Sequence, residues 1–284
     1  MRKIPGFLLT SAVCLLTLLA GCLHPAPTPG QARPQAKPIG GDAERRLVTA
    51  KPRLMSADYR ADLDELARLR EEVAPLADDP ALGYLAHYWA GFASWRIAIN
   101  GASRGMSAQD LEAHLERAGA DFEASLRLRD DFADAHAAAA MAVSWLAGFH
   151  SKDPAAMQEQ WQKSRGLLKR ARELEPNNPR VLWAVGATYL FSPPQYGGSL
   201  EHAVETYRRM LEVSETTNAA SPLPDWGKPE ALMSLAFAHL QQSPPDLAAA
   251  NEEARAALRL QPEWSYVRDV LVPQIEAAQR KAVP

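Results

Sequence analysis

The chain has 284 residues, of which 47% are hydrophobic, enough for one ordinary core or a short array of repeats. Its formal net charge of −3 argues against a surface that binds nucleic acid or an anionic membrane. The only two cysteines, Cys14 and Cys22, lie near the N-terminus, so a disulfide framework or a cysteine metal site is excluded from the rest of the chain.

The first residues have the pattern of an export signal. Arg2 and Lys3 precede an apolar run over residues 4–19, which is too short for a typical transmembrane helix. The sequence Leu-Ala-Gly-Cys follows and ends at Cys22. It resembles the lipobox of bacterial lipoproteins, which implies a signal peptide over residues 1–21 and lipidation of Cys22. An ordinary cleaved signal with an incidental cysteine is the alternative. By analogy with Gram-negative lipoproteins, Leu23 after the cysteine implies the outer membrane, facing the periplasm.

Residues 22–53 are expected to form a lipidated, disordered tether ahead of a folded domain over residues 54–284. No apolar period is visible in this stretch, and prolines and glycines are frequent. These residues are Pro25, Pro27, Pro29, Gly30, Pro34, Pro38, Gly40, Gly41 and Pro52.

From residue 54 onward, apolar residues recur at helical spacing. The pattern predicts helices over residues 58–74, 80–99, 108–128, 134–149, 154–174, 178–190 and 200–211. A further pair begins at Lys228, and a last helix over residues 265–282 is expected to bend near Pro273.

The clearest helical pair spans residues 177–211. One face of its first helix carries Leu182, Val185, Gly186 and Tyr189. One face of its second helix carries Ala203, Tyr207 and Met210. A small residue, Gly186 or Ala203, lets the helices approach closely, and a tyrosine fills the space beside it. This pattern resembles a tetratricopeptide repeat. The resemblance implies an all-α, right-handed array of helical hairpins, with about four degenerate pairs and a C-terminal capping helix.

In the tetratricopeptide family, the first helices line a concave face. The resemblance places an unusually apolar set there: Met141, Trp183, Leu190, Met233 and Phe237, flanked by His87 and Ser144. Large exposed apolar surfaces mark binding sites, and methionines suit adaptable contacts. We expect either a groove for an apolar ligand or peptide, or a tightly curled array whose side chains pack on one another.

The turn between the two helices at 177–211 contains Tyr196, Gly197, Gly198 and Ser199. The glycines permit positive φ angles and Ser199 can cap the next helix, so the turn has a purely structural interpretation. A loop that contacts a ligand or partner is the alternative. The Tyr-Gly-Gly-Ser string is similar to one in the T-component lipoproteins of periplasmic TRAP-type transporters, which are lipid-anchored helical-repeat proteins with a hydrophobic pore. This implies an alternative role as a small apolar ligand carrier or accessory transporter component.

The sequence predicts no catalytic, metal or cofactor site. No two of the seven histidines lie three to five residues apart, and no catalytic or phosphate-binding motif is found. His136 and His239 are expected to be structural. We therefore expect a non-enzymatic lipoprotein of the cell envelope that binds or scaffolds protein partners, contacts the membrane through its N-terminal lipid and does not bind nucleic acid.

Overall fold

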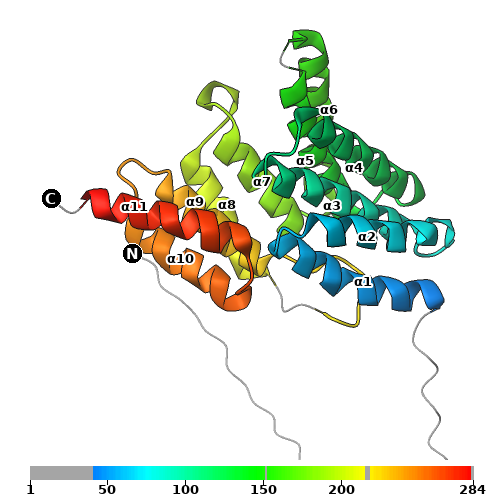
Figure 1. Ribbon diagram of the computed structural model, residues 1–284. Coiled ribbons are helices and arrows are strands. Elements are labelled where there is room, and N and C mark those ends of the chain that lie inside the picture. The colour runs from blue at the N-terminus through cyan, green and yellow to red at the C-terminus, as the bar shows by residue number, and fades with distance from the viewer. Residues whose placement is uncertain (1–40, 151, 215–217, 283–284) are drawn as a thin grey trace, which may run out of the picture. The chain divides into compact units, whose positions relative to one another are not determined.

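The computed structural model describes residues 41–150, 152–214 and 218–282, and all regular elements of this part are helical (Figure 1). The elements, in chain order, are α1 (Asp42–Tyr59), α2 (Leu63–Val73), η1 (Ala74–Asp78), α3 (Gly83–Ala102), α4 (Ala108–Leu128), α5 (Ala133–Phe149), α6 (Pro154–Leu174), α7 (Pro179–Phe191), η2 (Pro194–Tyr196), α8 (Leu200–Val213), α9 (Lys228–Leu240), α10 (Leu247–Leu260), η3 (Val267–Leu271) and α11 (Val272–Ala282). The expected signal peptide, Cys22 and the first part of the expected tether lie outside the described residues.

The helices pack as successive hairpins, which confirms the expected all-α array. The strongest packing joins α3 to α4, α5 to α6, α7 to α8 and α9 to α10, and neighbouring hairpins also pack on each other (Figure 1). One more pair, formed by α1 and α2, precedes the four that were expected. A single hairpin cannot bury its apolar stripe alone, so the stacking of neighbours creates the core.

Helix α1 corrects the expected tether, which was wrong over residues 42–53. This helix buries one stripe of residues spaced at the helical period: Ala43, Leu47, Ala50, Leu54 and Ala57. Pro52, one of the residues that suggested disorder, lies inside the helix on its exposed side. The stripe packs on α2 and α3, so the folded domain begins at Asp42 rather than at residue 54.

The turn after α1 divides what was expected to be one helix over residues 58–74. Ala61 adopts a φ of +52°, and the Asp62 side chain accepts a hydrogen bond from the Glu65 backbone N–H at 3.1 Å. Asp62 therefore caps α2, as aspartate does at many helix N-termini. Helix α3 also starts later than expected, at Gly83, because a turn precedes it.

The α7–α8 pair has the close packing that its sequence predicts. A Cβ atom added at Gly186 would lie 2.4 Å from a ring carbon of Tyr207, so only glycine permits this approach. The Tyr207 ring and Ala203 are fully buried beside it. This contact fixes α7, which carries residues at both ends of the face described below.

The chain's last helices close the end of the array, as expected for a cap. Val267, Leu271 and Ile275 are fully buried and pack with alanines of α10. The π-helical turn η3 leads directly into α11, which contains Pro273, and the bend expected near this proline stays a prediction.

Helix α1 also contacts the last hairpin. The Tyr59 ring lies 4.9 Å from the Trp264 ring, and Ser265 Oγ donates a hydrogen bond to the Tyr59 carbonyl at 3.2 Å. The Tyr59 hydroxyl donates to Glu230 Oε1 of α9 at 2.5 Å. The first and last parts of the described array are therefore joined directly.

Candidate functional site

The predicted groove residues lie on the first helices of the hairpins, and we call the surface formed by α3, α5, α7 and α9 the first-helix face. Its two ends differ. Near the N-terminal ends of α7 and α9, it is covered by the segment 218–227, which we call the strap. Near their C-terminal ends it is open, with aromatic side chains in solvent. We call these two regions the covered end and the open end.

The strap runs through the covered end with alternate residues buried. Pro222, Pro224 and Trp226 are buried, whereas Leu223 is exposed and Asp225 is half-buried. Alternation of this kind is the pattern of an extended chain with one side against a surface. Residues 222–226 of the strap therefore lie across the array as a bound extended peptide would, after a turn closed by a hydrogen bond from the Ser221 N–H to the Asn218 carbonyl.

Polar groups of α1 and α3 bind the strap's backbone. The Trp89 indole Nε1 donates to the Pro222 carbonyl at 2.8 Å. Lys51 Nζ donates to the Asn218 carbonyl at 2.8 Å and forms a 2.7 Å ion pair with Asp225. Lys51 is only 3% exposed, so this ammonium group depends on the strap for its partners.

Aromatic rings hold the strap's tryptophan. The Trp226 ring lies 5.8 Å from the Trp183 ring and 6.5 Å from the Phe92 ring. Its indole Nε1 donates to the Tyr88 hydroxyl at 3.4 Å. Trp183 in turn packs edge-on against Trp95, with 5.6 Å between ring centroids. Trp183, expected to line an open wall, is thus largely covered by neighbouring rings.

Two indole donors of this cluster have no acceptor. The Nε1 atoms of Trp95 and Trp183 are buried and make no hydrogen bond within the part of the chain that the structure describes. Buried polar groups usually have partners, and each orphan costs free energy. Trp89, on the same helix as Trp95, makes the bond to a strap carbonyl that these two lack.

Charged groups join the helices around the covered end. Arg96 of α3 forms a 2.6 Å ion pair with Asp58 of α1, and Arg180 of α7 forms a 2.5 Å pair with Asp134 of α5. Burial raises the pKa of the Glu230 carboxyl, although the hydrogen bond from Tyr59 opposes this shift. Its Oε2 atom has no partner among the described residues. Glu230 is therefore a costly buried group at the junction of α1 and α9.

The open end is formed by the last turns of α7 and α9. Phe191 is 68% exposed, and its ring lies 5.9 Å from the ring of Phe237. Leu190, Met233 and Phe237 are half-buried, so three of the predicted wall residues do reach the surface here. Phe191 was missed because it is one position beyond the residue that the repeat pattern assigns to the face.

Two other residues of the expected wall lie elsewhere. Met141 is only 9% exposed and packs in the core, because α5 is rich in alanine and lies close to its neighbours on both sides. His87 Nδ1 lies 3.6 Å from Asp121 Oδ1 of α4, so its ring faces the partner helix of its own hairpin. The expectation that Met141 forms an exposed wall was therefore wrong, whereas Ser144 is exposed as expected.

The Tyr196–Ser199 turn has the structural features expected of it. Gly197 has a φ of +91°, and a Cβ atom at Gly198 would lie 1.8 Å from the Ser192 carbonyl oxygen. Ser199 Oγ accepts a hydrogen bond from the His202 backbone N–H at 3.2 Å and caps α8. Tyr196 is 67% exposed, with its ring 6.1 Å from Trp161 of α6. Its role in binding stays a prediction.

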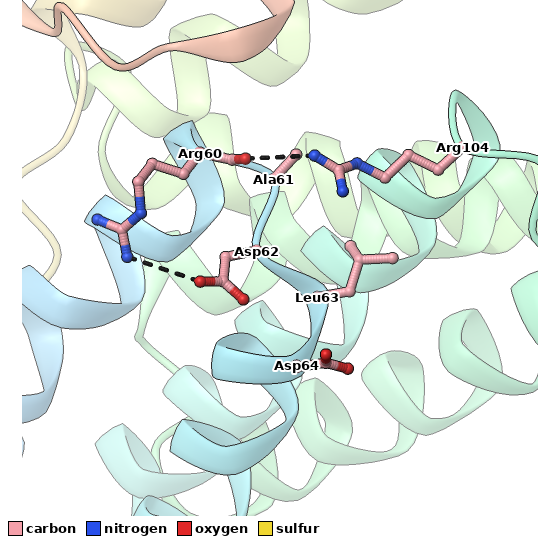
Figure 2. Close-up of a pocket in the computed structure, with 6 residues that line it drawn as sticks. All are labelled: Arg60, Ala61, Asp62, Leu63, Asp64 and Arg104. Atoms are coloured by element: carbon pink, nitrogen blue, oxygen red, sulfur yellow. Dashed lines mark hydrogen bonds and ion pairs between the residues drawn. The ribbon is translucent and has the colours of Figure 1, made fainter.

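A separate open depression of about 460 Å³ lies beside the α1–α2 turn (Figure 2). Arg60 in its wall pairs with Asp62 at 3.8 Å, and Arg104 Nη2 donates to the Arg60 carbonyl at 3.5 Å. The depression thus carries charged side chains of both signs, and none of its lining residues belongs to the predicted groove.

Among the described residues, no group of three or more histidine, cysteine, aspartate and glutamate side chains is placed to hold a metal ion. The ring of His239 is buried and its Nδ1 lies 2.7 Å from Glu253 Oε2, in keeping with its expected structural role. In the described part of the chain, no helix is both long and apolar enough to cross a membrane.

No protein-family model matches the chain, and no curated protein matches its sequence.

Proposed function

We propose that the protein is a non-enzymatic lipoprotein of the bacterial outer membrane, facing the periplasm, that holds an apolar segment of a protein partner at the open end of its first-helix face. The observation that carries this proposal is the exposed Phe191 ring beside the half-buried ring of Phe237. Aromatic side chains that remain in solvent beside half-buried aliphatic ones are typical of protein-binding surfaces. Half-buried Leu190 and Met233 on the same helices extend the apolar area.

The lipobox and the position of α1 together define the reach of the anchored protein. Asp42, where α1 begins, lies twenty positions after Cys22. At about 3.5 Å per residue, this length of chain spans at most roughly 70 Å. The proposed anchor therefore allows the array to meet partners in the periplasm at some distance from the lipid.

The proposal is tested by purifying the full-length protein in detergent from its own cell envelope and identifying what remains bound. We expect a stoichiometric protein partner with the wild-type chain and its loss with Phe191→Ser or Phe237→Ser. Leu260→Ser is the matched control, because Leu260 is 45% exposed on α10, outside the first-helix face. Equal recovery from all variants would contradict the proposal. A small apolar molecule without a protein partner would instead support the carrier role.

A further inference from the structure

The strap shows which chemistry the covered end recognises. We propose that the covered end is a peptide-binding seat in which the strap is the resident ligand, and that an extended partner segment with the same features can bind there in its place. Those features are prolines at alternate positions, followed by an acidic residue and a tryptophan. This inference rests on the proposed function and deepens it by naming the kind of partner segment.

Hydrogen-bond donors on the array bind the backbone carbonyls of the strap. Trp89 Nε1 binds the Pro222 carbonyl, and Lys51 Nζ binds the Asn218 carbonyl at 2.8 Å and the Leu223 carbonyl at 3.4 Å. A proline cannot donate a hydrogen bond from its nitrogen, but its carbonyl remains a full acceptor. A surface that binds the backbone of a segment through its carbonyls therefore suits a proline-containing extended segment.

Two side chains give the seat its selectivity. Asp225 pairs with the buried Lys51 ammonium at 2.7 Å, and Trp226 occupies a site between Phe92 and Trp183 with its indole N–H directed at the Tyr88 hydroxyl. An uncharged residue in place of the aspartate would leave the ammonium buried without its counter-ion, which is costly.

The seat is built without the strap. Its helices are joined by the Arg96–Asp58 pair between α3 and α1 and by the Arg180–Asp134 pair between α7 and α5. Arg180 also donates to the Trp226 carbonyl at 3.3 Å, but through Nη1, whereas its Nε atom holds Asp134. Because these two ion pairs do not include strap residues, we expect the helices of the seat to stay together when the strap leaves.

A partner segment can form bonds that the strap does not. The Trp95 and Trp183 indoles lie in the same aromatic cluster as Trp226 and have no acceptor. We expect a partner segment that brings a backbone carbonyl to either donor to gain a bond of the kind that Pro222 makes with Trp89. Satisfying buried orphan donors recovers free energy that the strap leaves unused, which allows a partner to compete with a covalently attached ligand.

The test uses a labelled peptide with the sequence of residues 218–227, Asn-Ala-Ala-Ser-Pro-Leu-Pro-Asp-Trp-Gly, added to the full-length protein. Trp226→Ala removes the ring that packs against Trp183 and Phe92, so we expect the strap to leave the seat more often than in the wild type. Because an attached segment acts at an effective concentration in the millimolar range, we expect this variant to bind the peptide at least ~100-fold more tightly than the wild-type chain. Fluorescence anisotropy measures both affinities.

Matched peptides and a second protein variant make the result specific. Peptides with alanine for the tryptophan, or asparagine for the aspartate, should bind ~10-fold more weakly or worse. Adding Lys51→Met to the vacated seat should remove the preference for aspartate over asparagine. Asp225→Asn, which keeps the Trp226 ring but loses the ion pair, should show an affinity between those of Trp226→Ala and the wild type.

Three results would overturn the inference. The first is no peptide binding at 1 mM by variants whose circular dichroism matches the wild type, and the second is equal binding of the alanine-substituted peptide. The third is unfolding of both strap variants, which would show that the seat does not exist without the strap. In each case the strap is a fixed brace, and partner capture through Phe191 and Phe237 would be unaffected, so the two proposals fail separately.

Discussion

The covered and open ends of the first-helix face share helix α7, yet the aromatic side chains at the two ends differ in exposure to solvent. At the covered end, the Trp183 ring packs against the ring of Trp226, which belongs to the strap. At the open end, the Phe191 side chain is 68% exposed, and its ring lies 5.9 Å from that of the half-buried Phe237. The comparison teaches that an apolar residue at a repeat's groove position predicts a contact, but not whether the contact is with the same chain or with a partner.

The largest effect is expected at the covered end, from Lys51→Met. This change leaves the half-buried Asp225 carboxylate without its counter-ion and two strap carbonyls without their donor. We expect a loss of roughly 3 kcal/mol in the free energy of unfolding. This value is at the lower end of the usual cost of breaking a buried ion pair, because Asp225 keeps some contact with solvent. Urea unfolding measures it. Lys169→Met, at a side chain 79% exposed, should change the free energy by less than about 0.5 kcal/mol.

An intermediate effect is expected from moving α7, the helix that both ends share. Gly186→Ala places a methyl group where the Tyr207 ring lies 2.4 Å away, so α7 and α8 must separate. We expect a loss of about 1–3 kcal/mol in stability, the usual cost of overpacking. Gly166→Ala is the control, since this exposed position in α6 has open space around it and alanine should stabilise the helix by up to about 1 kcal/mol. Thermal unfolding that shifts in the same direction for both would contradict this account.

The junction of α1 and α9 should make stability depend on pH. The pKa of Glu230 is raised by burial above its ordinary value of 4.5, so the folded state holds this proton more tightly than the unfolded state. The resulting stability is fully present below pH 4.5 and is lost as the pH rises through the raised pKa. Tyr59, Asp58 and Arg96 also face this carboxyl and contribute to its shift.

Glu230→Gln should remove this dependence. At pH 7.5, we expect the free energy of unfolding of the variant to be at least as large as that of the wild type. At pH 4.5, the variant should be less stable in comparison with the wild type. Urea unfolding across that range measures both. Glu201→Gln, an exposed position in α8, should leave the pH profile unchanged. Parallel profiles for the wild type and Glu230→Gln would show that Glu230 does not carry the shift.

The smallest effect on stability is expected at the open end. Phe191→Ser removes a side chain that is mostly in solvent, so the free energy of unfolding should change by no more than about 0.5 kcal/mol. Partner recovery should nevertheless fall, which would separate this end from the covered one. A large loss of stability would place Phe191 among the structural residues.

Much of the helical architecture could be predicted because its signals are local. Helices α4 and α6 begin and end at the predicted residues, where Ser107 and Asp153 accept hydrogen bonds from the first turns. The apolar stripe of α1 was also present in the sequence. Its signal was overlooked because the proline and glycine content of the preceding residues and of Pro52 was given more weight than the spacing of Leu47, Ala50 and Leu54.

The covered end could not be predicted because its contacts are not local. The strap has no helical period, and Trp89 and Trp226 meet their partners across 133 and 138 residues of chain. No spacing rule connects Lys51 to Asp225, which lies 174 residues away. Some residues of the open end could be predicted, since Leu190 and Phe237 follow from the repeat pattern. Phe191 does not follow from it.

The hydrogen bond between Tyr59 and Glu230 has a consequence for the way the protein folds and unfolds. In an open repeat array each unit touches only its neighbours, so such arrays can lose units one at a time from either end. Here residues 171 positions apart are bonded, and their meeting requires closure of a long loop. We expect the hairpins to form early and the closure to come late, which slows folding relative to other helical proteins. Once closed, the terminal helices should lose their amide protection together with the central ones rather than before them.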